Sequence, residues 1–218
     1  MGKSKWSREN PAFRQWRFVI ILVTSLGLLC CAGWAFFVKG LYLLPADMCE
    51  GTLKRDLAIQ VLPQARSADQ GSRREGAGSD FAFYCHVSTS RDSLMFGQAK
   101  VTQISREDWL KYYKRSGDDQ PVIRVSVGDI EALALPDSRT SAVYVPCKPT
   151  VVPEDEAKRP FAVISEMNVN GAAKLKGVPL RQALTDVAYK MAAHTYELAE
   201  CKAPRSFPKE LPRYGAGV

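Results

Sequence analysis

Two histidines, His86 and His194, are the first candidates for metal binding or proton transfer. His86 lies where polar and apolar residues alternate, and His194 lies in a helical stretch between Met191 and Leu198. A metal site needs several ligands at fixed spacing, yet the sequence contains neither H-E-x-x-H nor C-x-x-C. The sequence therefore predicts no metal or cofactor site, and both histidines are expected to be exposed or satisfied within the core.

Patterns for catalysis are equally sparse. The sequence has no G-x-S-x-G and no S-x-x-K paired with a later K-T-G. Residues 71–78 are rich in glycine but lack the lysine and the following helix of a phosphate-binding loop. The acidic runs at 107–108, 118–119 and 154–156 are interpreted as helix caps or solvated loops, because carboxylate catalysis requires groups that converge in space. No catalytic residue is assigned.

Trp109, Tyr112 and Tyr113 form the aromatic group that most suggests a binding feature. Residues three and four apart lie on one side of a helix, so this spacing is typical of a short helix that packs on a sheet. A ring left exposed there would be available to a ligand or a protein. The three residues are therefore candidate partner contacts, although packing is the simpler interpretation.

Four of the six cysteines, Cys49, Cys85, Cys147 and Cys201, lie in the C-terminal part of the chain. An even number of cysteines is typical of proteins in an oxidising compartment, where disulfides persist. The sequence predicts two disulfides, and four cysteines permit three connectivities.

Residues 18–38 contain no charged side chain. At about 1.5 Å per residue a helix of this length covers roughly 31 Å, about the thickness of a bilayer core. A cleaved signal peptide is the alternative, but its apolar region is only about 7 to 15 residues long. The sequence therefore predicts a transmembrane helix, which places Cys30 and Cys31 in lipid as buried thiols, with palmitoylation as the alternative.

The formal net charge of +7 is concentrated before this helix. Residues 1–17 contain five basic and one acidic side chain, whereas residues 40–218 contain 24 basic and 22 acidic ones. The positive-inside rule therefore predicts a cytoplasmic N-terminus and an extracytoplasmic C-terminal domain at the cell membrane. The nearly neutral exterior part makes nucleic acid an improbable partner, and the lipid bilayer is the expected one.

The chain divides into five segments. We expect a basic cytoplasmic N-terminus at residues 1–17, a transmembrane helix at 18–38, a juxtamembrane linker at 39–45, one domain at 46–202 and a disordered Pro-rich tail at 203–218. Within the domain, helices are predicted at 47–62, from 105 onward and at 179–201. Strands are predicted at 81–87, 94–104, 122–127, 130–135, 141–147 and 161–169. Residues 65–80 are predicted to form a mobile loop and residues 136–138 a turn.

Consecutive strands between a first and a last helix favour an α+β fold, with an antiparallel sheet and helices packed on one face. In this arrangement Cys49, at the start of the first helix, lies within reach of Cys85 on the first strand. Cys147 at a strand end lies within reach of Cys201 at the end of the last helix. The pairing 49–85 and 147–201 is therefore preferred, because each bridge would fasten a terminal helix to the sheet.

The layout resembles that of uncharacterised single-pass membrane proteins of actinobacteria. The resemblance rests on the short basic N-terminus, the anchor, the Met-Cys-Glu-Gly-Thr-Leu sequence at 48–53, the Phe-Tyr-Cys sequence at 83–85 and the closing helix that ends in a cysteine. The domain is also similar in layout to the two-disulfide ectodomains of some mycobacterial receptor kinases, although no kinase precedes the anchor. The resemblance implies a disulfide-linked extracytoplasmic α+β domain, and it does not carry a function.

These features favour a non-catalytic interaction or sensing module of the cell envelope, with an envelope protein as partner. One alternative is an envelope hydrolase with a dispersed active site, which a cleft holding His86 or His194 beside a carboxylate or a serine would favour. The other alternative is a small-ligand-binding domain, which a large apolar cavity between helices and sheet would favour.

Overall fold

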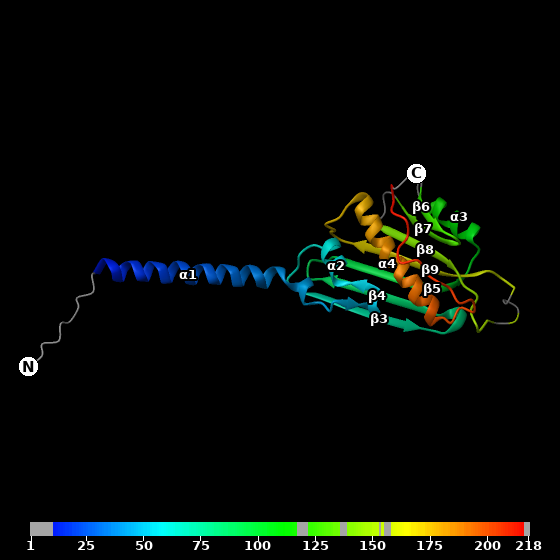
Figure 1. Cartoon of the computed structure of the whole chain (residues 1–218), viewed down its shortest axis with the longest axis horizontal. Helices are drawn as coiled ribbons and strands as arrows, with labels where there is room; N and C mark the ends of the chain where they lie inside the picture. The colour runs from blue at the N-terminus through cyan, green and yellow to red at the C-terminus, as the bar shows by residue number, and fades with distance from the viewer. Residues whose placement is uncertain (1–10, 117–121, 136–138, 153, 155–157, 216–218) are drawn as a thin grey trace, which may run out of the picture.

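The computed structural model describes residues 11–116, 122–135, 139–152, 154 and 158–215. Helix α1 (Pro11–Val38) projects from a single α+β domain (Figure 1). Its stretch Gln15–Gly33 is long and apolar enough to cross a membrane. The hydroxyls of Thr24 and Ser25 donate to the carbonyls of Ile20 (2.9 Å) and Leu22 (3.0 Å), so both are satisfied within the helix.

The segment predicted as a linker after α1 packs against the domain. It forms the short helix η1 (Gly40–Leu43), in which Leu41 is 1% exposed. The Gly40 N–H donates to the Ala65 carbonyl (3.0 Å), and a Cβ at position 40 would lie 2.6 Å from the same oxygen. A glycine is therefore required at this close approach, and the folded domain begins directly after α1.

Seven antiparallel strands form one sheet in the order β3-β4-β5-β9-β8-β7-β6. The strands are β3 (Ala68–Glu75), β4 (Ala82–Thr89), β5 (Leu94–Gln103), β6 (Ile123–Val127), β7 (Ile130–Ala134), β8 (Thr140–Pro146) and β9 (Phe161–Asn170). The central strands β5 and β9 pair over ten residues, from Leu94 opposite Asn170 to Gln103 opposite Phe161. This long pair joins the two halves of the sheet.

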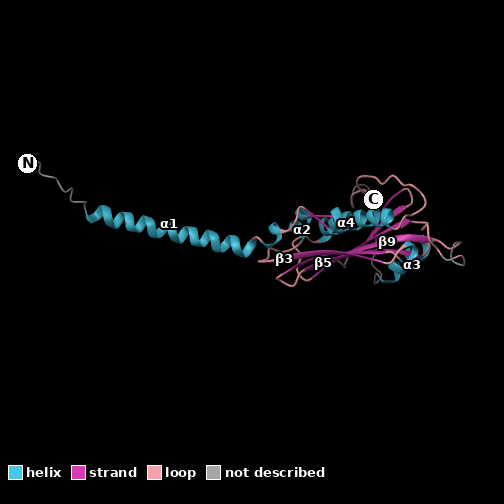
Figure 2. Cartoon of the chain, turned by 90° about the horizontal axis from the view of Figure 1, so that it is seen from below, coloured by secondary structure: helices cyan, strands magenta, loops and turns pink. Residues whose placement is uncertain are grey.

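Helices lie on both faces of the sheet, and the α+β class is confirmed (Figure 2). Helix α4 (Gly177–Leu198) and the shorter α2 (Arg55–Val61) cover one face, together with a small hairpin of β1 (Asp47–Met48) and β2 (Leu53–Lys54). Helix α3 (Arg106–Ser116) packs on the opposite face. The first and last helices thus share a face as expected, and α3 adds a layer on the other side.

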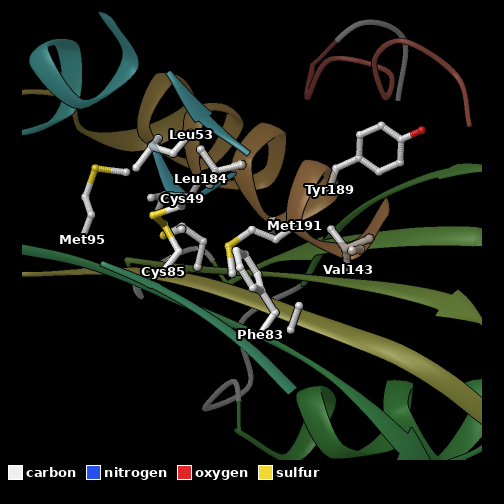
Figure 3. Close-up of a cluster of buried hydrophobic side chains, with 14 of the residues drawn as sticks. Cys49, Leu53, Phe83, Cys85, Met95, Val143, Leu184, Tyr189 and Met191 are labelled. Carbon is white, nitrogen blue, oxygen red and sulfur yellow. A yellow bond between two sulfur atoms is a disulfide. The ribbon is translucent and has the colours of Figure 1, made fainter. Parts of the chain in front are cut away.

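The larger core lies between the sheet and α4 (Figure 3). Phe83, Leu184 and Met191 are completely buried there, beside the Cys49–Cys85 disulfide. A Cβ on Gly97 of β5 would lie 2.6 Å from the Met191 sulfur. The missing side chain therefore lets α4 approach the centre of the sheet.

The prediction of a mobile loop at residues 65–80 was wrong, because these residues contain strand β3 and, at Gly78–Asp80, the short helix η3. β3 pairs with β4 over eight residues, from Ala68 opposite Thr89 to Glu75 opposite Ala82. It is an edge strand whose second half is exposed, so it has no apolar period of its own. Its stability comes from hydrogen bonding to β4.

The prediction of one helix over residues 47–62 was also wrong in its first half. Cys49 and Glu50 have φ angles of 50° and 58°, which a continuing right-handed helix does not allow. These residues form a turn, η2 (Cys49–Gly51), between β1 and β2. The α-helix begins only at Arg55, so the β1–β2 hairpin and its disulfide-bonded turn replace the first half of the predicted helix.

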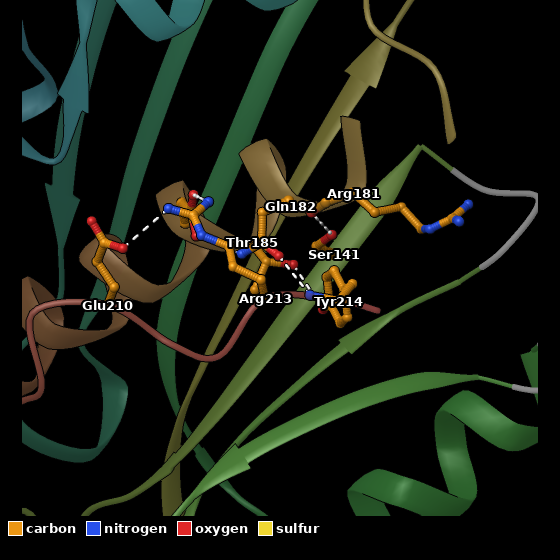
Figure 4. Close-up of polar contacts among 8 residues, drawn as sticks. Ser141, Arg181, Gln182, Thr185, Glu210, Arg213 and Tyr214 are labelled. Carbon is orange, nitrogen blue, oxygen red and sulfur yellow. Dashed lines mark hydrogen bonds and ion pairs between the residues drawn. The ribbon is translucent and has the colours of Figure 1, made fainter. Parts of the chain in front are cut away.

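The tail predicted as disordered packs along α4 (Figure 4). Leu211 and Tyr214 are buried. The Tyr214 N–H donates to the Gln182 side-chain oxygen (2.9 Å), and its hydroxyl shares a hydrogen bond with Thr185 (2.9 Å). The three prolines prevent regular structure, but the tail satisfies its polar groups against α4 and covers that helix up to residue 215.

The remaining elements agree with the sequence to within a few residues. The Asp108 N–H donates to the Ser105 hydroxyl (3.1 Å), so the predicted cap opens α3. The predicted turn at 136–138 and the acidic pair at 118–119 lie outside the described residues.

Candidate functional site

The four domain cysteines form two disulfides that join the helical layer to the sheet. Cys49 pairs with Cys85 and Cys147 with Cys201, with Cα–Cα distances of 5.5 and 5.3 Å. Of the three possible connectivities, this is the one that the sequence favoured, and the prediction is confirmed. The second bridge fastens the chain just after α4 to the end of β8. Cys30 and Cys31 in α1 are free thiols.

The predicted aromatic group lines a cleft of about 310 Å³ between α3 and the sheet, here called the α3 cleft. Trp109 and Tyr113 are buried, with ring centroids 5.3 Å apart, and Trp109 also contacts Tyr144. Tyr112 is 60% exposed. The Tyr112 ring packs edge-on against Tyr113, with centroids 5.1 Å apart, and it is the most exposed of the three rings.

Polar groups from β5 and β9 form the floor of the α3 cleft. The Tyr113 hydroxyl donates to the Glu166 carboxylate, and Gln98 and Lys100 lie beside it on the same face. Burial is the main cause that raises the pKa of Tyr113, and the Glu166 charge adds to it. Tyr113 therefore acts as a neutral donor that holds the Glu166 carboxylate in place.

A second cleft, of about 510 Å³, lies at the end of the sheet where β9 begins and is here called the distal cleft. Strand β5 begins beside η1, because Ser90 at its hairpin donates to the Ser67 carbonyl next to Gly40. It ends at Gln103 opposite Phe161, and Phe161 lines the cleft. The strands lead away from the end of α1 (Figure 1), and ten residues of strand cover roughly 30 Å, so Phe161 lies far from the point where α1 joins the domain.

Four basic residues line the distal cleft: Lys148, Lys158, Arg159 and Arg205. None of its described lining residues is acidic. The other lining groups are mainly apolar or aromatic: Tyr144, Pro146, Val152, Pro160, Phe161, Tyr196, Ala203 and the bridged Cys147. The described part of this cleft therefore offers positive charge above a base of buried rings, and no histidine, serine or carboxylate is among its described lining residues.

Two of these cations are held in place by neighbouring side chains. Arg205 makes a two-point ion pair with Asp129, with Nη2 2.7 Å from Oδ2, and its guanidinium lies 5.6 Å from the Tyr196 ring centre. Hydrogen bonding to Asp129 is the main cause that raises the pKa of Arg205. The Arg159 guanidinium donates to the Gln103 amide oxygen when that amide is placed in its hydrogen-bonded orientation. Because its pKa is raised, Arg205 remains charged at any physiological pH, and both guanidinium groups have fixed partners.

No protein-family model, no curated protein and no solved structure matches this chain. The function is therefore inferred from the clefts and polar clusters themselves.

One histidine does lie beside a carboxylate, as the hydrolase alternative requires. His194 Nε2 is 2.9 Å from Glu50 Oε2, and the His194 ring packs edge-on against Phe83. Both Glu50 oxygens, however, also accept hydrogen bonds from Arg74 (Nε at 3.0 and 3.1 Å). Neither His194 nor Glu50 lines the α3 cleft or the distal cleft. The cluster of Glu50, Arg74 and His194 therefore has a structural role, because it joins η2, β3 and α4.

The other histidine, His86, lies on the opposite face of the sheet. A Cβ on Gly71 of β3 would be 2.7 Å from its ring carbon Cε1, so the ring lies over this glycine. Within the described residues no group of three His, Cys, Asp or Glu side chains could hold a metal ion. His86 and His194 are separate features of the fold, and the structure does not bring them together.

The ion pair between Glu50 and Arg74 makes the stability of the fold depend on pH in the acid range. The Arg74 guanidinium is the main cause that holds the pKa of Glu50 below its ordinary value of 4.5. A carboxyl whose pKa is lower in the folded state contributes stability above the unfolded pKa and loses it as pH falls through the folded pKa. Glu50→Gln is therefore expected to be less stable than the natural protein at pH 7, and this difference should shrink below pH 4.5.

Urea unfolding of the full chain at pH 7 and at pH values below 4.5 measures this difference. Glu75→Gln is the matched control, because Glu75 forms an ion pair with the largely exposed Arg73 and is itself half exposed. A Glu50→Gln effect that stays the same across this range would show that the ion pair with Arg74 is not its cause.

Sequence reasoning missed the distal cleft. Its residues come from separate segments at 144–148, 152, 158–161, 196 and 203–205. The only local signal is the Lys-Arg pair at 158–159, which follows three acidic residues and therefore reads as an ordinary charged loop.

Proposed function

We propose that this protein is a single-pass membrane-anchored module that binds another component of the cell envelope and does not catalyse a reaction. The N-terminus would be cytoplasmic and the α+β domain extracytoplasmic, as the basic residues before α1 favour. Two disulfides support an oxidising compartment for the domain.

The observation that carries the binding function is the composition of the distal cleft. This cleft of about 510 Å³ faces away from the anchor, and its described lining offers four cations but no histidine, serine or carboxylate. The apolar space between α4 and the sheet is filled by core side chains, which argues against a small-ligand pocket there. Recognition by an exposed surface is therefore the favoured function, with Tyr112 in the α3 cleft as a second contact point.

Retention in the envelope tests this proposal. After the membrane is dissolved with a mild detergent, most of the full chain is expected to remain with the insoluble envelope fraction. A control with residues 1–45 and a tag, which has the anchor but lacks the domain, should be extracted with the lipid. Protease added to intact cells should degrade the domain and leave an N-terminal tag intact.

Equal extraction of both proteins by detergent would contradict binding to a further envelope component. Protection of the domain from external protease would overturn the orientation, and with it the oxidising compartment.

A further inference from the structure

The distal cleft combines fixed guanidinium groups with two lysines that have no described partner. Lys148 and Lys158 are exposed, and no carboxylate among the described residues lies within 4 Å of either amine. The backbone at Lys148 is held in place, because its carbonyl accepts from the Lys202 N–H (2.8 Å) beside the Cys147–Cys201 bridge. The Lys148 side chain therefore extends into solvent from a backbone that is held in place, and the exposed Lys158 lines the same cleft.

Aromatic rings form the base of the cleft beneath its cations, and they are largely covered, with Tyr144, Phe161 and Tyr196 only 4%, 7% and 4% exposed. Tyr196 lies under the Arg205 guanidinium, and Phe161 lies at the start of β9 on the same wall. The cleft is open to solvent along Lys148, Lys158 and Arg159, all of which are exposed. An open channel with charges along its rim suits an extended chain, because an enclosed pocket would be needed to surround a small anion.

The distance of the cleft from α1 indicates where such a chain comes from. The cleft lies at the end of β5 and β9 that is opposite to η1, so the surface of the membrane that holds α1 is roughly 30 Å away along the strands. Electrostatic attraction to lipid headgroups falls off within a Debye length of about 8 to 10 Å. Headgroups of that membrane therefore do not reach the cleft, whereas a polymer of the surrounding envelope does.

We propose that the distal cleft binds a linear polyanion of the cell envelope, with Lys148 and Lys158 as the main charge contacts and Arg159 and Arg205 as fixed donors. The shared chemistry is one negative charge per repeat, carried by a phosphodiester or by a sugar carboxylate. Arginine forks and lysine point charges bind both groups. This inference rests on the proposed function and names the ligand class of its principal cleft.

Binding of labelled polymers to the full chain in zwitterionic nanodiscs tests the inference. The polymers are poly(glycerol phosphate), polygalacturonate and neutral dextran, and fluorescence anisotropy is measured in 50 and 200 mM salt. At least one of the two anionic polymers is expected to bind, with affinity that falls steeply as salt rises, because bound counterions are released from the polyanion. Dextran should not bind.

The decisive variant is Lys148→Gln with Lys158→Gln. Each lost cation near an anionic surface costs about a factor of five, so the pair is expected to weaken binding roughly 30-fold. The matched control is Lys190→Gln with Lys209→Gln, two exposed lysines that share another surface hollow with Asp186 and Glu210. The control pair should change affinity by less than about two-fold, since its charge is already offset.

The relative affinity of the two anionic polymers identifies the source of the charge. The inference is overturned if neither anionic polymer binds at 50 mM salt, if dextran binds equally well, or if the two lysine pairs weaken binding equally. Unchanged thermal unfolding of both variants shows that the fold is intact, as expected for exposed side chains. If the chain remains in the detergent-insoluble envelope but binds no polyanion, the envelope-binding function stands and only the ligand class fails.

Discussion

Replacing Cys147 and Cys201 together with alanine is expected to lower the free energy of unfolding by about 4 kcal/mol. The bridge joins residues 54 positions apart, and a cross-link of this span removes much of the conformational freedom of the unfolded chain. It also fastens the C-terminal end of α4 to the end of β8, beside the distal cleft. The loss is large relative to the total stability of an ordinary domain, which is about 5 to 15 kcal/mol.

Urea unfolding of the full chain in detergent, compared with and without a reducing agent, measures this effect. Replacing Cys30 and Cys31 with serine is the matched control, because both thiols are free and lie in α1. The control should leave the unfolding of the domain unchanged. A loss below about 1 kcal/mol, or peptide mapping that recovers Cys49 linked to Cys147, would contradict this account of the bridge.

Removing both arginines that hold Glu131 is expected to destabilise the domain by about 3 kcal/mol. The Glu131 side chain on β7 is only 1% exposed, and it pairs with Arg106 of α3 (2.6 Å) and Arg124 of β6 (2.5 Å). Arg106→Ala with Arg124→Ala would leave a buried carboxylate without a positive partner. The lower end of the usual range applies because both arginines are half exposed, so water can enter.

Adding Glu131→Gln to the double variant provides the control for charge. The neutral amide has nearly the same shape and a smaller desolvation cost, so stability should partly recover. Urea unfolding followed by near-ultraviolet circular dichroism detects both changes, because Trp109 and Tyr144 pack in the cluster beneath α3. If the amide brings no recovery, loss of side-chain packing rather than the buried charge is the cause.

The sequence predicted those elements whose residues carry their own pattern. The alternation in β4 and the apolar stripe of α4 each reflect one buried face, and the apolar run of α1 is continuous, so local sequence is sufficient to find these elements. The cysteine pairs followed because each half lies at an end of such an element. Helix α3 was also found from its cap at Ser105 and its aromatic rings.

The elements that were missed depend on distant partners. β3 is polar and exposed over most of its length, and only the hydrogen bonds of β4 make it a strand. The turn at Cys49 and Glu50 holds positive φ angles because Cys85, Arg74 and His194 bind it from three other elements. The tail is ordered by hydrogen bonds from Tyr214 to Gln182 and Thr185 of α4, and the tail's own sequence does not indicate these contacts.

The candidate sites divide in the same way. Tyr112, Trp109 and Tyr113 are close in sequence, so their common cleft could be anticipated from helical spacing alone. The distal cleft could not, because its cations become neighbours only after β8, β9 and the chain after α4 meet at one end of the sheet. A nearly neutral domain charge also conceals a local excess of positive groups.

The direct junction between α1 and the domain has a mechanical consequence. α1 and the strands run along the same long axis (Figure 1), so a pull between the bilayer and an object held at the far end loads β5 and β9 in shear. In shear the hydrogen bonds of that ten-residue pair resist together instead of opening one after another. On the membrane side the Cys49–Cys85 bridge passes the force into β4, so only residues 39–48 can peel away before a covalent bond bears the load. The fold is therefore suited to carry tension between α1 and a load at the far end of the sheet.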